Sequence, residues 1–212
     1  MHTPDGFLHP WMATAFLVVS TSVLAFAASR ARTSLSPYRI QLFGIVAASV
    51  FAAQMLNWPI PGGTSAHFVG GAFAAIVLGP HLGALAVALA VTVQALVFGD
   101  GGALALGANV WNMAIVEAYV GYAVYTTLAN RNEVLATVAG GWVGITAAAA
   151  SAGLQLAVSP AFSGSALSVL IVMTVGHFAL GIGEGVLTLV GTRLLSRAGA
   201  AQPSHSSEGV GA

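Results

Sequence analysis

The first two residues, Met1 and His2, form a metal chelator if the chain keeps its terminal amine. The Met1 amine, the backbone amide nitrogen of His2 and the Nδ1 atom of its imidazole can bind one ion together. The amine and amide close a five-membered ring, and the amide and Nδ1 close a six-membered ring. Three nitrogens in one plane leave one in-plane position, and four nitrogens in a square suit Ni²⁺ or Cu²⁺. Binding must also displace the amide proton.

His67 is the candidate for the fourth nitrogen, because it follows a proline- and glycine-rich loop between two apolar segments. Irregular backbone at membrane depth is tolerated only where it is buried in protein or lines a cavity. Thr64 and Ser65 in this loop, and Asn109 further along, are candidates to orient the imidazoles by hydrogen bonds. For Asn109 the alternative is loop anchoring, and for His2 alone it is an ordinary solvated position.

Composition indicates an integral membrane protein. Of 212 residues, 57% are hydrophobic and 6% are charged, whereas soluble domains average about 25% charged residues. The zero net charge gives no sign of a nucleic-acid partner, and the absence of cysteine excludes disulfides and thiolate metal sites within this sequence. Lysine is also absent, so a phosphate-binding GxxxxGK[ST] loop is impossible here. Any ATP hydrolysis that powers this protein must come from another chain.

The apolar pattern predicts one all-α domain over residues 1–197, with seven transmembrane helices, followed by a disordered cytoplasmic tail over 198–212. All six arginines lie between spans, near the end of the seventh span or just after it, in places that a seven-span ladder puts on one side, so the positive-inside rule makes that side cytoplasmic. The N-terminus is then outside. We expect Met1 to be retained, because His2 is large. The predicted spans are Pro10–Ser29, Ile40–Leu56, Ala66–Gly79, Leu82–Phe98, Ala108–Leu128, Val134–Val158 and Leu167–Leu195.

Three ionisable residues lie inside the predicted spans: Glu117, His177 and Glu184. Ionisable groups at such depth are a functional hypothesis by default. We expect Glu117 and His177 to neutralise each other as a pair. The three residues form either a polar relay along a release path or a set of contacts that stabilise helix packing or subunit docking.

Four stretches carry a resemblance to a known family: MHTPDGFL, NWPIPGGTSAHFVGG, QALVFGDGGALALGANVWNMA and HFALGIGEGVLT. Together they resemble the CbiM/NikM family, the substrate-binding (S) subunits of energy-coupling-factor (ECF) transporters for nickel and cobalt. The resemblance implies a six-helix core with an extra N-terminal helix, and a terminus inserted into the bundle from outside. It also implies Met1, His2 and His67 as the metal ligands, and a place in the cytoplasmic membrane of a prokaryote.

The partners that the resemblance implies are a transmembrane coupling subunit, two ATPase subunits and a small auxiliary membrane protein. The chain itself would be a transport subunit and not an enzyme. Pro4-Asp5 resembles the nickel-type start of this family, but Thr3 stands where isoleucine is usual, so nickel and cobalt both stay open.

Two other functions are weighed against this one. A stand-alone secondary transporter would use Glu117, His177 and Glu184 as a proton relay, but the sequence shows no inverted repeat. An intramembrane hydrolase would need an activated serine, and no GxSxG motif is present.

Overall fold

The computed structural model describes residues 1–60 and 64–199, except for the side chains of residues 57–66. Helices account for most of this part of the chain, and a short antiparallel ribbon pairs Asn57 with His67. The elements are α1 (Pro10–Ala31), η1 (Arg32–Ser34), α2 (Pro37–Gln54), β1 (Asn57–Ile60), β2 (Thr64–His67), α3 (Gly71–Leu78), α4 (Pro80–Val93), η2 (Gln94–Phe98), α5 (Leu106–Val110), η3 (Trp111–Val116), α6 (Glu117–Ala129), α7 (Glu133–Val158) and α8 (Ala166–Arg197).

Local sequence explains where several helices begin. Proline occupies the first turn of α1, α2 and α4, where its missing N–H would have had no partner in the helix. Ser36, Asn132 and Ser165 cap α2, α7 and α8, and each side chain accepts a hydrogen bond from the backbone N–H three residues later. The helix starts therefore follow ordinary capping rules.

The third predicted span differs most from the structure. We expected a helix over Ala66–Gly79, but β2 continues to His67 and α3 begins only at Gly71. Gly70 between them has a φ angle of +79°, a left-handed conformation that glycine adopts without steric cost. His67 is thus the last residue of a strand, and the turn at Gly70 leads into a short helix that is fully buried.

Small residues bring the helices into close contact within the chain. A Cβ atom on Gly83 would collide with the α3 backbone at Ala74 and Ala75. Gly140 faces the backbone of Gly121, and a Cβ there would lie 2.8 Å from the Gly121 carbonyl oxygen. Gly83 and Gly140 belong to the GxxxG spacings Gly79/Gly83 and Gly140/Gly144, so these spacings include positions that pack helices inside this chain.

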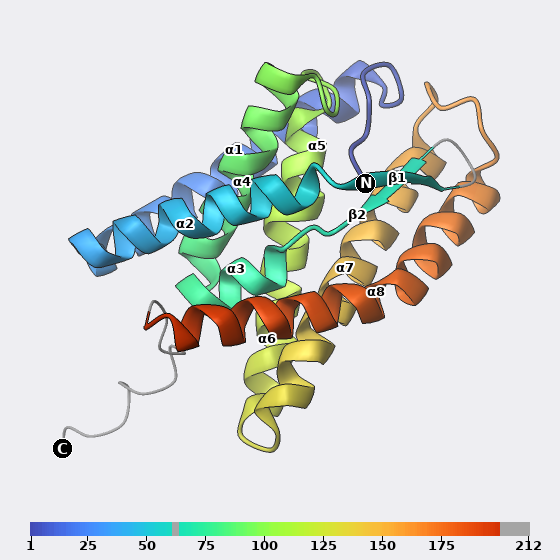
Figure 1. Cartoon of the computed structure of the whole chain (residues 1–212). Helices are drawn as coiled ribbons and strands as arrows, with labels where there is room; N and C mark the ends of the chain where they lie inside the picture. The colour runs from blue at the N-terminus through green and yellow to red at the C-terminus, as the bar shows by residue number, and fades with distance from the viewer. Residues whose placement is uncertain (61–63, 200–212) are drawn as a thin grey trace.

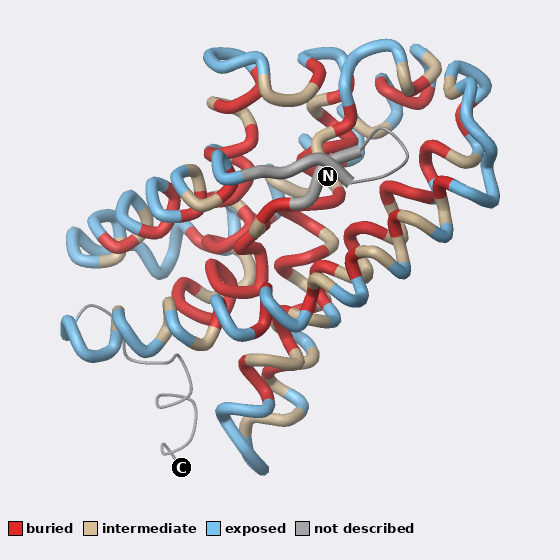
Figure 2. Tube along the Cα trace, turned by 45° about the vertical axis from the view of Figure 1, so that its right-hand side comes forward, coloured by how far each residue is buried: buried red, intermediate tan, exposed pale blue. Residues whose placement is uncertain are grey.

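Large apolar side chains cover the outside of the bundle, as expected of a multi-pass membrane protein. In Figure 2 buried stretches face the centre, while exposed ones lie on the outer faces and in the connections. Four helical stretches within the described residues are long and apolar enough to cross a bilayer: Pro10–Ser34, Pro80–Phe98, Glu133–Val158 and Ala166–Arg197.

The two ends of the bundle carry different features. In Figure 1 the N-terminal segment lies beside β1 and β2, on the side of the α7–α8 connection. The α1–α2 connection and the C-terminal end of α8 lie together on the opposite side of the view. The predicted tail over 198–212 falls almost entirely outside the described residues.

Candidate metal site

The N-terminal segment folds back into the bundle and buries its first residue. Met1 is only 1% exposed, and its amine nitrogen lies 3.1 Å from Nε2 of His67. Neighbouring corners of a square around a metal ion lie about 2.8 Å apart when each metal–nitrogen bond is about 2 Å long. The amine and the imidazole are therefore placed to occupy neighbouring corners of one square.

His2 lies against His67 in the same buried region. Their rings stack with centroids 4.7 Å apart and an angle of 19° between the ring planes. Gly101 permits this approach: a Cβ at that position would lie 3.2 Å from Cβ of His2 and 3.0 Å from the Asn109 side-chain nitrogen. The structure thus brings Met1, His2 and His67 together from the terminus and from β2.

Hydrogen bonds determine which imidazole nitrogens carry a lone pair. Nδ1 of His67 lies 2.9 Å from the Phe68 carbonyl oxygen; a carbonyl only accepts, so Nδ1 donates and Nε2 holds the lone pair. Nε2 of His2 donates to the side-chain oxygen of Gln94 at 3.2 Å, which leaves the lone pair on Nδ1. Both lone pairs are on the nitrogens that the proposed chelate needs.

Nδ1 of His2 has no hydrogen-bond partner in the described part of the chain. A carboxylate oxygen of Asp100 lies 3.5 Å from it. A buried nitrogen without a hydrogen bond is costly, and a cation bound there would satisfy it. The Asp100 carboxylate beside this nitrogen would favour that cation electrostatically.

Burial keeps all three groups neutral near pH 7. It lowers the pKa of the Met1 amine from 8.0 to about 5, while the Asp100 carboxylate opposes the shift. Burial, with a further contribution from the terminal amine, lowers the pKa of His2 from 6.5 to about 4. The pKa of His67 is well below 6.5, mainly because of its burial. Neutral nitrogens offer lone pairs without first losing a proton to solvent.

The terminal segment is held in place by backbone-directed hydrogen bonds. The Asn109 side chain both accepts from the Thr3 N–H at 2.8 Å and donates to the Thr3 carbonyl at 3.0 Å. The Thr3 carbonyl also accepts from the Gly102 N–H at 3.0 Å. One carboxylate oxygen of Asp5 accepts from the N–H groups of residues 104 and 105. Asn109 therefore anchors the segment that carries the chelate and does not bond an imidazole.

Two residues of this site were not predicted as ligand-orienting groups: Gln94 and Asp100. Gln94 was not singled out in the sequence, and for Asp100 the sequence favoured a turn residue over an outer carboxylate that attracts cations. The signal in the sequence was a glutamine within the apolar stretch Leu82–Phe98; the structure shows that it is fully buried. The predicted contacts of Thr64 and Ser65 concern side chains outside the described residues.

Glu117 and Glu184 support the chain directly after His67. Glu184 accepts hydrogen bonds from the Val69 and Gly70 N–H groups at 3.1 and 2.8 Å. Glu117 accepts from the Gly71 N–H at 2.7 Å and from the Ala72 N–H at 3.4 Å. These N–H groups lie at the start of α3, where carboxylates are favourable and a helix offers no internal partner. The two glutamates, from α6 and α8, thus fasten the backbone that carries His67.

The predicted ion pair between Glu117 and His177 is wrong. Glu117 is bound to backbone N–H groups, and Nδ1 of His177 lies 2.9 Å from the Met173 carbonyl oxygen. The neighbour whose charge acts on Glu117 is Glu184. The i to i+7 spacing places His177 and Glu184 on one face of α8, but it does not show which side chain lies opposite.

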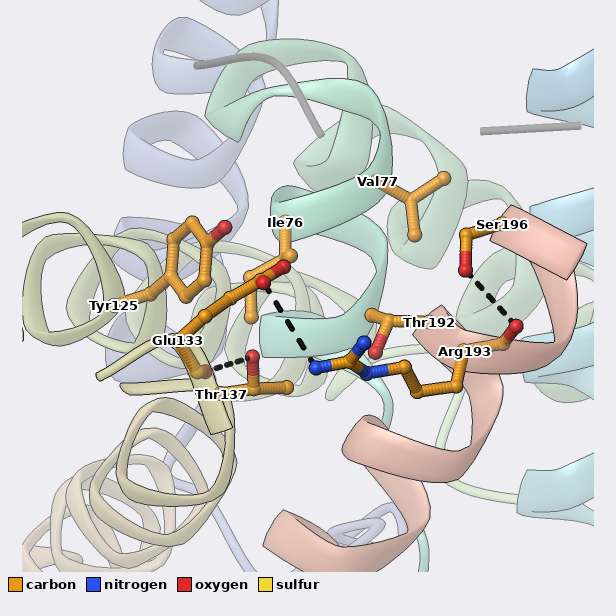
Figure 3. A pocket seen from close by; sticks show the side chains of 8 residues that line it. All are labelled: Ile76, Val77, Tyr125, Glu133, Thr137, Thr192, Arg193 and Ser196. Carbon is orange, nitrogen blue, oxygen red and sulfur yellow. Dashed lines mark hydrogen bonds and ion pairs between the residues drawn. The ribbon is translucent and has the colours of Figure 1, made fainter. Parts of the chain in front are cut away.

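A pocket of about 240 Å³ lies at the other end of α3 and is separate from the histidines. Figure 3 shows Glu133 and Arg193 reaching toward each other across it, with 3.8 Å between a carboxylate oxygen and a guanidinium nitrogen. Both side chains are half exposed, so this ion pair contributes little to stability. Its lining residues are Ile76, Val77, Tyr125, Glu133, Thr137, Thr192, Arg193 and Ser196.

Known proteins similar to this chain are transport proteins. A putative fused nickel transport protein NikMN of Archaeoglobus fulgidus is 53% identical over 188 residues, which cover 89% of this chain and 63% of that protein. A cobalt transport protein CbiM of Acetoanaerobium sticklandii is 33% identical over 202 residues, covering 92% of this chain and 84% of that protein. This chain therefore spans less than two thirds of the length of the fused relative.

Solved structures agree with these relatives. A crystal structure of a truncated transition metal transporter superposes with a TM-score of 0.89 and 35% identity, covering 93% of this chain and 99% of that one. The family described as the cobalt uptake substrate-specific transmembrane region, CbiM, matches residues 2–201. With nearly its whole length matched and its fold shared, this chain belongs to the CbiM family of metal transport proteins.

Proposed function

We propose that this protein captures Ni²⁺ on the extracytoplasmic side of a prokaryotic cytoplasmic membrane, as the substrate-binding subunit of an ATP-driven ECF-type uptake transporter. The observation that carries the proposal is the buried Met1 amine, 3.1 Å from Nε2 of His67 and beside the stacked His2 ring. The ion would bind the Met1 amine, the His2 amide nitrogen, Nδ1 of His2 and Nε2 of His67.

The preference for nickel over cobalt rests on geometry. Four nitrogens in one plane suit Ni²⁺, and Cu²⁺ fits the same plane and binds more tightly in general. Availability of the metal would then have to exclude copper. The alternative is a cobalt-specific subunit for cobalamin synthesis, since both nickel and cobalt transport proteins are similar to this chain.

The energy for transport would come from partner chains. From the resemblance to ECF substrate-binding subunits we infer a transmembrane coupling subunit, two ATPase subunits and a small auxiliary membrane protein. ATP hydrolysis would lie on the partners, because this sequence has no lysine to build a phosphate-binding loop. Docking of this chain to the coupling subunit would convert capture into uptake.

Metal analysis of protein purified with its native terminus tests the proposal. We expect one Ni²⁺ per chain in a yellow, diamagnetic complex, because a square of strong nitrogen donors enforces low-spin binding. Mass spectrometry of the same sample should show an unmodified Met1. A paramagnetic six-coordinate complex, or a retained ion on a chain whose first residue is trimmed or acetylated, would contradict the proposed ligand set.

The second candidate, a stand-alone secondary transporter, predicts uptake in cells that lack the partner subunits, and loss of that uptake with an uncoupler. The contacts of the glutamates weigh against it. Glu117 and Glu184 are bound to backbone N–H groups at the start of α3, which suits a fixed support better than a proton carrier.

Binding of Ni²⁺ should release about one proton per ion at pH 7. The pKa values of Met1 and His2 are lowered to about 5 and about 4, and that of His67 is also lowered, so these groups are already deprotonated. Only the His2 amide then loses a proton. Affinity should fall about tenfold per pH unit between pH 8 and 6, and more steeply as the amine protonates near pH 5.

Calorimetry in buffers of different ionisation enthalpy counts these protons. With ordinary pKa values for the amine and both imidazoles, more than two protons would leave at pH 7. A count above two would therefore show that burial does not keep the site neutral. An affinity independent of pH between about 5 and 8 would show that the amide is not a ligand.

A further inference from the structure

A third buried histidine, His177, offers a lone pair that nothing in the site described so far uses. The His177 side chain is fully buried. Its Nδ1 donates to the Met173 carbonyl at 2.9 Å, so Nε2 holds the lone pair. Nε2 is buried and has no hydrogen-bond partner within the described residues. Buried polar atoms without a partner are rare, and each one calls for an explanation.

Two contacts align α8 with the chain that follows His67. Glu184 accepts from the N–H of Gly70. Further along both segments, Phe73 of α3 packs against Gly191 of α8. The two segments therefore run side by side in the same direction. His67 lies three residues before Gly70, and His177 lies seven residues before Glu184.

Glu184 links the part of α8 that carries His177 to the chain that follows His67. Seven helical residues, about 10 Å, separate His177 from Glu184, and Glu184 also accepts from the N–H of Val69, two residues after His67. The Met1 amine acts electrostatically on His177, and His177 acts on His67, so the three groups lie within electrostatic range of one another. Nε2 of His177 is therefore a fifth nitrogen in the same buried region as the four proposed ligands.

We propose that His177 is an additional metal ligand, which binds the ion through Nε2 while the ion leaves the square site. This proposal rests on the proposed function, since it assigns a further ligand to the same captured ion. The step is a ligand exchange: a bond from the ion to Nε2 of His177 forms, and a bond to one of the four original nitrogens breaks. The charge on the ion does not change, and the His2 amide regains its proton when its own bond breaks.

The exchange addresses a physical difficulty of the chelate. An ion held by a five- and a six-membered ring leaves slowly if every bond must break before a new one forms. A nitrogen on α8 lets the bonds break one at a time. Binding to His177 also moves the ion toward α8, which carries Glu184, and away from the N-terminal segment that supplies three of its first ligands.

A double-mutant cycle with His67→Ala tests the proposal. His67→Ala removes the fourth in-plane nitrogen, so His177 should then become the strongest remaining ligand beside the chelate. We expect His67→Ala to weaken Ni²⁺ binding by about ten- to a hundredfold, which is the range for disturbed metal sites. Adding His177→Leu should weaken it at least another tenfold, whereas His177→Leu alone should change equilibrium affinity less than threefold, because the square is then intact.

His81 provides the matched control, since it is another membrane histidine and bonds the Tyr119 hydroxyl at 2.8 Å. The combination of His67→Ala with His81→Leu should bind like His67→Ala alone. Cu²⁺ serves as a spectroscopic probe on the same proteins, because the hyperfine pattern in electron paramagnetic resonance counts bound nitrogens. We expect four nitrogens in His67→Ala, and three when His177→Leu is added.

The outcomes separate this inference from the proposed function. If the unaltered protein binds no Ni²⁺, the proposed function fails. If it binds Ni²⁺ but His177→Leu has no effect in the His67→Ala background, and three nitrogens are counted in both, only the role of His177 is overturned. His177→Gln, which keeps a polar side chain, repeats the comparison if the leucine variant does not fold. It too should reduce the count from four nitrogens to three.

Discussion

One extra residue before Met1 should abolish nickel binding. The added residue turns the Met1 nitrogen into an amide and moves the free amine by about 3.8 Å along the chain. The five-membered ring between the amine and the His2 amide can then no longer form. The buried Met1, 1% exposed, also leaves no room for an additional residue, so the whole segment would have to shift. We expect affinity to fall at least about a thousandfold, or about 4 kcal/mol.

Competition with a coloured chelator measures this loss for a protein with one glycine added before Met1. A protein with one glycine added after Ala212 is the matched control. The control should bind like the unaltered protein, because the added residue leaves the Met1 amine and the three proposed ligand residues unchanged. Mass spectrometry must show that the extra residue is present on the purified chain. An extended protein that still binds with the original affinity would show that the terminal amine is not a ligand.

The sequence predicted the candidate metal ligands better than the residues that lie against them. Met1 and His2 form a chelator by position alone, and His67 was the histidine next to a loop that had to be buried. The structure brings these three residues together, while their binding of metal stays a prediction. Gln94 and Asp100 could not be ranked from sequence, since only the folded chain shows that they face His2.

The wrong pairing of Glu117 with His177 has a physical reason. Charge neutralisation between side chains was the expected solution for buried ionisable groups. The structure uses backbone N–H groups at the start of α3 instead. These donors exist only because Gly70 turns the chain and starts a new helix there. Apolar pattern alone predicts a continuous span at this place, so it misses both the turn and the donors.

The apolar pattern predicted the bounds of a helix well where the helix is long and polar residues or proline mark its ends. The predicted span Val134–Val158 differs from α7 by one residue at its start, and Pro10–Ser29 begins where α1 begins. The π-helical turns η2 and η3 were not predicted. Such turns add a residue to a helix without changing its hydropathy. The one that starts at Gln94 ends at Phe98, two residues before Asp100, so local irregularity is concentrated around the candidate site.

Gly102→Ala should be nearly as damaging as the extended terminus, although residue 102 binds no ion. A Cβ at this position would overlap the Asp5 carboxylate and the Asp5 backbone nitrogen. The Gly102 N–H also holds the Thr3 carbonyl at 3.0 Å. A shift there displaces the terminal segment, which supplies three of the four nitrogens, whereas His67→Ala removes only one. We expect Ni²⁺ affinity to fall at least about a hundredfold, or about 3 kcal/mol.

Gly44→Ala is the matched control, because a Cβ there meets nothing within 4 Å and alanine favours a helix. It should bind Ni²⁺ normally. The helices of Gly102→Ala should keep their circular dichroism, since residue 102 lies between η2 and α5. A Gly102→Ala protein with unchanged affinity would mean that the loop yields without moving the terminus. The chelate would then be positioned mainly by Asn109, whose two hydrogen bonds to Thr3 do not involve residue 102.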